Sequence, residues 1–283
     1  MTSAMCVAVG VLLVSAAVPR AHGATLLAIG SDPSTFVPDQ LTLANIVAQT
    51  VTPLATLGDG SLGFNGGLTF GPGSGLYAIA NDSSGAGSLY LVQLSGTLLL
   101  VGSPGGLGFG FYGGLTFDPQ DGLFYAAVND PGGNTSLYSV TAAGVSAPVG
   151  QSLGTGFSGL AFDPANGLFY GIGNDNNGLS TLYDFSLFGP VTAVAPLGFG
   201  FGGLTYDAAG DLFWAIAPVS NSGAQVFQIA TGGAESGPLL TLGDGFVELA
   251  APAASAPEPG SWAAAGSGLL VLAGMMRILR RKS

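Results

Sequence analysis

The sequence predicts an all-β fold, a five-bladed β-propeller built from four-stranded blades. A motif typified by GGLTF occurs four times, and its anchoring leucines, Leu68, Leu115, Leu160 and Leu204, are 47, 45 and 44 residues apart. Of the 283 residues, 48% are hydrophobic and 49 are glycine, whereas only 7% are charged. This composition suits short apolar strands joined by glycine-rich turns, and a period of about 40 to 50 residues is typical of propeller blades.

One repeat unit can be assigned strand by strand. In the unit that begins at Gly113, GLTF is the first strand, LFYAAV the second, LYSV the third and APVGQSLG the fourth with its crossing to the next blade. The turns DPQDG and NDPGGNTS separate them, and Asp, Pro and Gly suit the successive positions of a β-turn. The second strand is apolar on both alternating sets of positions, which predicts burial on both faces between neighbouring blades. The Gly-Gly pair that opens the first strand suits the crowded centre of a ring.

The two ends of the repeat region, residues 24–250, complement each other. LLAIGSDPS, which starts at Leu26, matches a second strand and its turn with no first strand before it, and GDGFVELA, which ends at Ala250, matches a first strand alone. We therefore expect the two ends to form one blade that closes the ring, because closure removes free sheet edges. A stacked sandwich or a solenoid of the same strands is the alternative.

The first 23 residues have the pattern of a secretory signal peptide. MCVAVGVLLVSAAVP is an apolar stretch of suitable length, and AHG places small residues before a cut after Gly23. The opening MTSA lacks the usual Lys or Arg, and a buried first strand or helix is the alternative interpretation. The only cysteine, Cys6, and the only histidine, His22, belong to this segment.

The C-terminal segment has three parts. A Pro/Ala linker, residues 251–259, ends in Pro257, Glu258 and Pro259, and the uncharged run that follows extends to Met276. With the next three residues it is long enough for a transmembrane helix over residues 260–279, ahead of a basic tail, residues 280–283. The membrane-orienting residues are Arg277, Arg280, Arg281 and Lys282. Basic residues stay in the cytoplasm, so the body of the chain is expected outside the inner membrane.

This ending resembles the PEP-CTERM sorting signal of Gram-negative bacteria, which combines a Pro-Glu-Pro motif, one transmembrane helix and an Arg-rich terminus in this order. The resemblance covers only the last 27 or so residues. It implies recognition at Pro257, Glu258 and Pro259 by an exosortase-type protease, after which the transient membrane anchor is discarded and the protein reaches the cell surface or the extracellular space. Bacteria with this system typically make extracellular polysaccharide, which is therefore the implied partner. A plain C-terminal membrane anchor is the alternative.

The available side chains exclude several kinds of chemistry. No Lys, Arg or His occurs between Ala24 and Trp262, and Cys6 is the only cysteine. The body therefore cannot build a Ser-His-Asp or Cys-His arrangement, a lysine Schiff base or an arginine clamp on phosphate, and zinc and copper lose their usual ligands. All sixteen acidic residues lie between Asp32 and Glu258, so nucleic acid and anionic lipid headgroups would be repelled.

Recurring aspartates are the candidate ligands of a metal ion, with calcium the one possible cofactor. They occupy the turns between second and third strands and those between fourth and first strands: Asp32, Asp82, Asp130, Asp175, Asp59 and Asp244. Both kinds of turn lie on one face of a propeller, and calcium takes carboxylate oxygens as ligands. The alternative is that each aspartate only opens its β-turn. A second series, Asp118, Asp163 and Asp207, is expected on the opposite face with a turn-forming role alone.

Aromatic residues also recur where one blade crosses to the next. They are Phe109, Phe111, Tyr112, Phe157, Phe199, Phe201 and Phe246. At a propeller mouth they could stack on sugar rings, or they could close the core between blades.

These observations favour a non-enzymatic binding or structural protein at the cell surface or in an extracellular matrix. A carboxylate-dependent glycosidase is the first alternative. It needs two carboxyl groups roughly 5 to 9.5 Å apart across a cleft, and only Glu235 and Glu248 remain as glutamates in the body. A calcium-stabilised adhesion module is the second.

Overall fold

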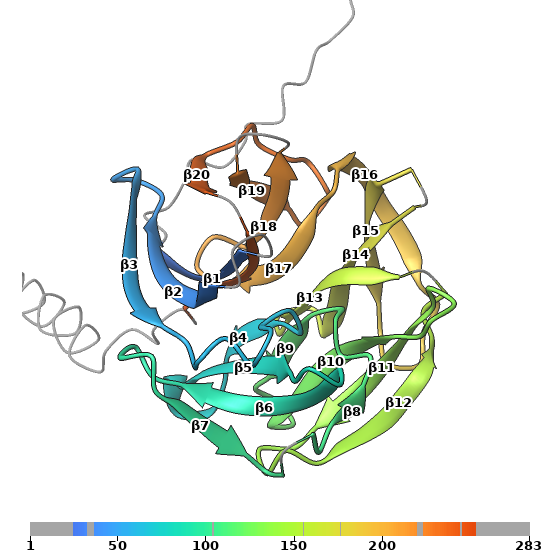
Figure 1. The fold of residues 1–283 in the computed structure, drawn as a ribbon. Helices are drawn as coiled ribbons and strands as arrows, with labels where there is room; N and C mark the ends of the chain where they lie inside the picture. Colours follow the sequence, from blue (N-terminus) through green and yellow to red (C-terminus); the bar gives the residue numbers. More distant parts are fainter. Residues whose placement is uncertain are drawn as a thin grey trace, which may run out of the picture.

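The computed structural model describes residues 25–32, 37–103, 105–154, 156–175, 177–219, 223–243 and 245–252. Within them the chain forms five antiparallel sheets arranged as blades around a central axis, which confirms the predicted five-bladed propeller (Figure 1). The predicted signal peptide, sorting motif, transmembrane helix and basic tail lie outside the described residues. Among the described residues, no helix has the length and hydrophobicity to cross a membrane.

Each blade consists of four strands, which are ordered from the innermost outward. Blade 1 is β21 (Phe246–Ala250), β1 (Thr25–Asp32), β2 (Val37–Asn45) and β3 (Thr50–Thr56). Blade 2 is β4 (Leu68–Phe70), β5 (Leu76–Asn81), β6 (Ala86–Val92) and β7 (Leu98–Val101). Blade 3 is β9 (Leu115–Asp118), β10 (Leu123–Asn129), β11 (Thr135–Val140) and β12 (Ser146–Ser152). Blade 4 is β13 (Phe157–Asp163), β14 (Leu168–Asn174), β15 (Leu179–Phe185) and β16 (Thr192–Phe199). Blade 5 is β17 (Gly202–Asp207), β18 (Leu212–Val219), β19 (Gly223–Ala230) and β20 (Leu240–Gly243).

The ring closes as the sequence predicts, because blade 1 takes strands from both ends of the repeat region. β21 pairs antiparallel with β1, with Leu27 opposite Ala250, Ala28 opposite Leu249 and Ile29 opposite Glu248. β21 also contacts the innermost strands of blades 2 and 5. The sheet edge that β1 would otherwise expose is therefore covered by a strand more than 200 residues away in the sequence.

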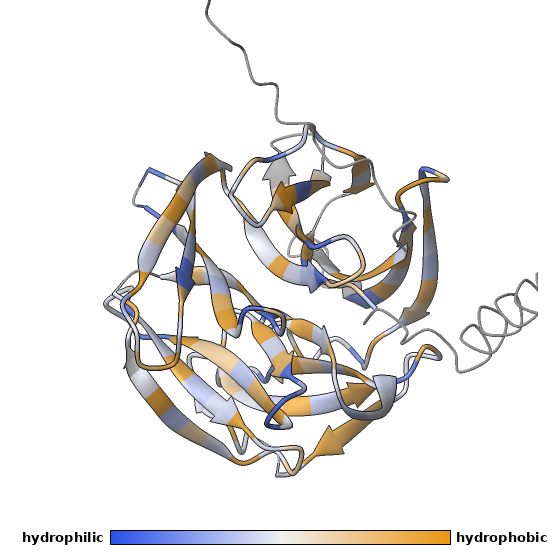
Figure 2. Ribbon diagram, turned by 180° about the vertical axis from the view of Figure 1, so that it is seen from behind, coloured by the Kyte–Doolittle hydropathy of each residue, from blue (hydrophilic) through white to orange (hydrophobic). Residues whose placement is uncertain are grey.

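The hydrophobic core lies between successive blades. In β10, Phe124 and Ala126 pack toward blade 2, whereas Tyr125 and Ala127 pack toward blade 4. Both faces of this second strand are buried, as its continuous apolar pattern predicts. Figure 2 shows hydrophobic residues distributed along the strands of every blade. Burial of these side chains supplies the main driving force for stacking the blades.

The Gly-Gly pairs let the innermost strands approach one another at the axis. Gly67 and Gly114 adopt φ values of 112° and 109°. A Cβ at Gly114 would lie 2.5 Å from the backbone nitrogen of Leu160, and one at Gly67 would overlap the backbone nitrogen of Leu115. Any side chain at either position would force neighbouring blades apart, so the predicted role of these glycines is confirmed.

Two local features depart from the repeat. The segment Gly108–Phe111 (GFGF) adds a short strand, β8 (Gly108–Phe109), to β6, and Gly108 and Gly110 take φ values of 87° and 92° there. The first turn of blade 2 lacks the recurrent aspartate and forms a short 3-10 helix, η1 (Pro72–Ser74).

Candidate functional site

A pocket of about 290 Å³ lies around the axis, on the face that carries the turns between first and second strands, which we call the pocket face. Equivalent positions of successive blades line it. The threonines are Thr69, Thr116 and Thr205, the aromatic residues Phe70, Phe117, Phe162 and Tyr206, and the prolines Pro72, Pro119 and Pro164. None of the residues that line it is charged. The pocket therefore offers hydroxyl groups and aromatic rings without a net charge.

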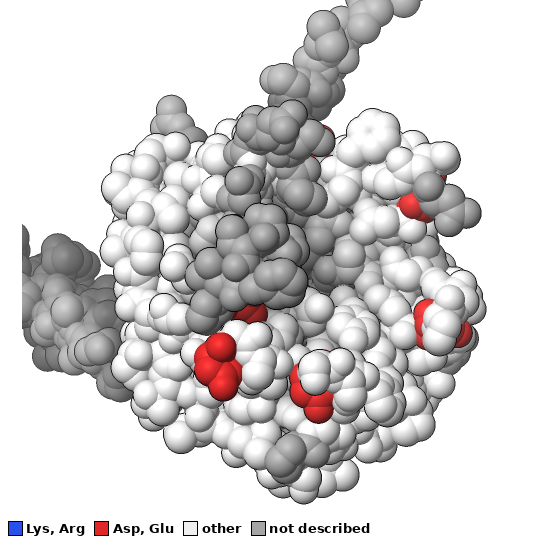
Figure 3. Space-filling model, in the orientation of Figure 1, with Lys and Arg blue, Asp and Glu red and all other residues white. Residues whose placement is uncertain are grey.

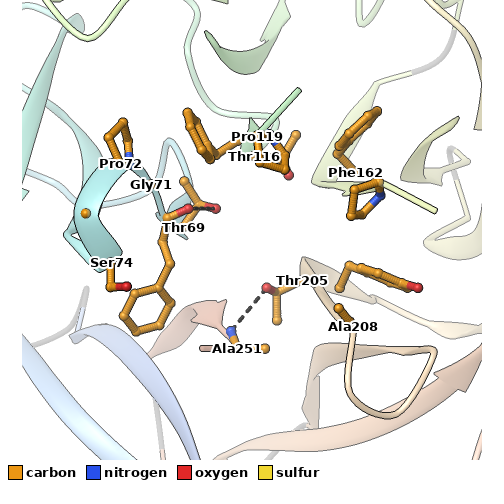
Figure 4. A pocket seen from close by; sticks show the side chains of 15 residues that line it. Thr69, Gly71, Pro72, Ser74, Thr116, Pro119, Phe162, Thr205, Ala208 and Ala251 are labelled. Atoms are coloured by element: carbon orange, nitrogen blue, oxygen red, sulfur yellow. Dashed lines mark hydrogen bonds between the residues drawn. The ribbon is translucent and has the colours of Figure 1, made fainter. Parts of the chain in front are cut away.

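The GLTF motif brings the threonines to this pocket. Side chains alternate along a strand, so the leucine of each motif packs toward the preceding blade while the next residue lies on the other side. Figure 4 shows Thr69, Thr116 and Thr205 around the pocket, each from a different blade. The hydroxyl of Thr205 accepts a hydrogen bond from the backbone N–H of Ala251 at 3.2 Å. The two remaining copies of this position are Ala161 and Ala250.

The second aspartate series holds the turns that form the pocket mouth. One carboxylate oxygen of Asp118, Asp163 and Asp207 accepts a hydrogen bond from the backbone N–H two residues further on, at 2.7, 2.8 and 3.0 Å. The other oxygen of Asp207 accepts one from the Trp214 indole N–H at 3.2 Å. These three aspartates are buried, and burial raises the pKa of Asp118. Their predicted role as turn residues is confirmed, and their turns place the prolines and Ala208 at the pocket.

Glu248 is the fifth copy of the axial glycine position. Its four counterparts are Gly67, Gly114, Gly159 and Gly203. Its side chain is only 5% exposed, and burial raises the pKa of its carboxyl group from 4.5 to about 8 although the backbone N–H of Gly67 donates a hydrogen bond to it. Blade 1 therefore carries a long acidic side chain where blades 2 to 5 have none.

The two candidate glutamates of a glycosidase are not brought together. Glu235 is exposed in the connection between β19 and β20, and its carboxylate accepts a hydrogen bond from the N–H of Gly198 in β16, the outermost strand of blade 4. Glu248 lies in β21, the innermost strand of blade 1. One carboxyl group is thus peripheral and the other axial, and they do not flank a common cleft.

The predicted calcium ligands lie in separate turns. Asp82, Asp130 and Asp175 each belong to a different blade, and Figure 3 shows the acidic side chains of one face as separate patches. Among the described residues, no group of three or more Asp, Glu, His or Cys side chains is placed to hold a metal ion. Asp244 and the side chain of Asp32 lie outside the described part of the chain.

Each described member of this series accepts hydrogen bonds within its own turn. Asp82 accepts from the N–H of Ala86 at 3.1 Å, and Asp175 from that of Leu179 at 2.9 Å. Hydrogen bonds lower the pKa of each carboxyl group, but the main donor differs. For Asp59 and Asp82 it is a serine side chain, Ser61 or Ser84, whereas for Asp130 and Asp175 it is a backbone N–H group. The carboxylates are therefore ionised and engaged locally, as in ordinary β-turns.

Six of the seven recurring aromatic residues divide into two groups, and the seventh, Phe246, is partly buried against the core between blades 5 and 1. Phe111, Phe157 and Phe201 are buried in the core between blades, whereas Phe109, Tyr112 and Phe199 are exposed. The core interpretation holds for the first group. The second group lies on the face of the turns between second and third strands, which we call the far face.

Comparisons with known proteins agree with this architecture. No family model and no curated protein matches the sequence. TolB from Acinetobacter baumannii has a TM-score of 0.51 at 17% identity, over 77% of this chain and 53% of TolB, so the chain spans about half the length of that protein. A chain of the nidogen/laminin complex has a TM-score of 0.50 at 12% identity, over 81% of this chain and 98% of its own length. The comparisons show the propeller fold alone.

The pocket residues and the burial of Glu248 were not singled out from the sequence. The threonine of GLTF recurs in three of the five blades, and this recurrence was the available signal. It could not be distinguished from ordinary strand composition, because β-branched residues are frequent in strands.

Proposed function

We propose that the chain is an exported, non-enzymatic binding propeller that associates with extracellular polysaccharide through the axial pocket. The observation that carries this proposal is an uncharged pocket lined by three threonine side chains and by aromatic rings from successive blades. Sugar hydroxyl groups can donate to and accept from threonine hydroxyls, while the apolar C–H face of a sugar ring packs on aromatic rings. A volume of about 290 Å³ is at the small end of the range for ligand pockets, and it suits a terminal sugar better than the length of a polymer.

A binding role is favoured over catalysis by the position of the acidic groups. General acid–base chemistry needs a carboxyl group within hydrogen-bonding reach of the reacting atoms. None of the residues that line the pocket is acidic, and Asp118, Asp163 and Asp207 use at least one carboxylate oxygen for their own turns. Glu248, whose raised pKa suits a proton donor, is enclosed at the axis.

Export and sorting are part of the same proposal. The apolar N-terminal segment, the Pro-Glu-Pro motif and the basic tail support secretion across the inner membrane and removal of the anchor by an exosortase-type protease. A variant in which Pro257, Glu258 and Pro259 are all replaced by Ala tests this step. We expect the variant to stay in the membrane fraction while the parent is released. Equal release of the two chains would contradict the assignment of the motif.

Binding is tested with the purified full-length chain on an array of polysaccharides and oligosaccharides. The double variant Thr69→Ala/Thr116→Ala removes two pocket hydroxyls, and Thr192→Ala, an exposed threonine of β16, is the matched control. We expect the parent and the control to bind a glycan that the double variant binds roughly tenfold more weakly, since each hydrogen bond contributes about 0.5 to 1.5 kcal/mol. No bound glycan, or unchanged binding by the double variant, would contradict the proposal.

A further inference from the structure

The far face displays two phenylalanines at equivalent places. The segment GFGF occurs at Gly108 to Phe111 and again at Gly198 to Phe201. In each copy the second phenylalanine is buried in the core, whereas the first, Phe109 or Phe199, is 68% exposed. The motif therefore anchors itself by one ring and presents the other to solvent.

The surroundings of the two exposed rings match. Phe109 pairs with Ala86 at the start of β6, and Phe199 pairs with Leu179 at the start of β15. The N–H groups of Ala86 and Leu179 in turn donate to Asp82 and Asp175. Each phenylalanine thus lies beside the third strand of its blade, next to a turn that begins with an aspartate.

A glycine of the neighbouring turn lies beside each ring. Gly85 and Gly178 complete the two turns with φ values of 85° and 80°. A Cβ at these glycines would make ordinary van der Waals contact with the rings, 3.7 Å from the Cδ1 atom of Phe109 and 4.0 Å from that of Phe199. Both rings therefore have the same neighbours, which are a residue at the start of the third strand, a turn glycine and an aspartate.

We infer that Phe109 and Phe199 are two stacking platforms for sugar rings of a polysaccharide on the far face. The π face of an exposed phenylalanine is partially negative and attracts the C–H groups of a pyranose face. On the neighbouring turn, Asp82 accepts the hydrogen bonds of its own turn through Oδ1, so its Oδ2 can accept from a sugar hydroxyl group. Since the body has no Lys or Arg to neutralise its carboxylates, the ligand is a polysaccharide without anionic groups.

These platforms are separate from the pocket. The pocket is formed by turns between first and second strands, whereas Phe109 and Phe199 adjoin turns between second and third strands, at the other end of each blade. The platforms specify a neutral polysaccharide as the ligand, and they depend on the proposed function only for the presence of polysaccharide where the protein works.

The experiment measures the affinity of the full-length chain for dextran and hydroxyethyl cellulose, which are neutral, and for alginate, which is anionic. The variants are Phe109→Ala, Phe199→Ala and the double variant. Phe188→Ala is the control, because Phe188 is 85% exposed in the turn between β15 and β16. We expect binding to a neutral polymer and not to alginate, with roughly tenfold weaker binding for each platform removed and no change for the control.

The outcomes separate this inference from the axial pocket. If the double phenylalanine variant binds as the parent does, if the control loses as much affinity, or if the parent binds neither neutral polymer, the platforms are refuted. A loss with Thr69→Ala/Thr116→Ala and none with the phenylalanine variant refutes the platforms and keeps the pocket. The reverse result keeps the platforms and refutes the pocket.

Discussion

Replacement of Glu248 by Gln should make the propeller more stable at neutral and alkaline pH. Glu248 lies in β21, the strand that closes the ring, and its carboxyl group is buried against the backbone of Gly67 in blade 2. The described residues contain no Lys, Arg or His that could compensate a charge there. Glutamine keeps the shape of the side chain and an oxygen that accepts the Gly67 N–H, but it cannot ionise.

The direction and size of the change in stability with pH follow from the pKa of Glu248. Burial raises the pKa of Glu248 from 4.5 to about 8 in the folded protein, so the folded state holds its proton more tightly than the unfolded state does. The resulting contribution to stability is fully present below pH 4.5 and is lost as the pH rises to about 8. At about 1.4 kcal/mol per pH unit, the loss reaches about 5 kcal/mol. In a domain of this size, that corresponds to a fall in melting temperature on the order of 10 °C.

The assay is thermal unfolding of the parent and of Glu248→Gln between pH 5 and pH 9. Below pH 5 the Asp59, Asp82, Asp130 and Asp175 carboxylates begin to protonate, and since their pKa values are lowered by hydrogen bonds, stability falls there in both proteins. We expect the parent to lose stability steadily toward pH 8 while the variant stays level.

Glu235→Gln is the matched control, because it removes an exposed carboxylate of the same residue type. This control should retain the pH dependence of the parent. A parent whose melting temperature is constant from pH 5 to pH 9, or a Glu248→Gln variant with the slope of the parent, would refute the reasoning. The same result would place the carboxyl group of Glu248 in contact with solvent.

Three further predictions address the ring, the turns and calcium. Gly67→Ala should destabilise the propeller by several kcal/mol in denaturant unfolding, because its Cβ would overlap Leu115. The control Gly232→Ala, which has open space around it, should be close to neutral. Equal effects of the two substitutions would contradict the axial contact. Asp207→Ala should cost about 1 to 3 kcal/mol, measured the same way, because it leaves the buried indole N–H of Trp214 without its acceptor. Calcium and chelator should leave the melting temperature within about 1 °C, and a larger rise with calcium would contradict this expectation by showing that the folded protein binds the ion.

The architecture was predictable because the same strand and turn signals recur in every blade. The spacing of the leucines indicated the blade period, and the incomplete units at the two ends predicted the pairing of β1 with β21. The double glycines marked the axis, where a side chain would overlap the neighbouring blade. Each of these signals is local in sequence and occurs in several copies, so a strand or turn that is unclear in one blade can be identified from the other blades.

The candidate site was harder to predict from the sequence, because it depends on which side chains meet at the axis. Thr69 and Thr116 are 47 residues apart, and only the ring brings their hydroxyls to one pocket. The burial of the aspartates could not be predicted either. Asp82 and Asp163 both begin turns in the sequence, yet the first is exposed and the second is buried. The exposure of Phe109 beside the buried Phe111 depends on the backbone at Gly110, whose positive φ the sequence permits without requiring.

In a repeat protein, a residue that nearly all copies share is explained first by the fold, whereas a residue that only some copies carry needs another reason. The aspartates recur because most blades use the same turns, and their hydrogen bonds within those turns account for the recurrence. Glu248 departs from four glycines at a place where a buried carboxyl group costs stability at neutral pH. Phe109 and Phe199 likewise fill a place that Leu62 occupies in the first copy, and nothing in the blade needs an exposed ring there. A cost that the fold does not require points to a role outside it, and the Glu248 and phenylalanine variants test that argument at two separate places in the propeller.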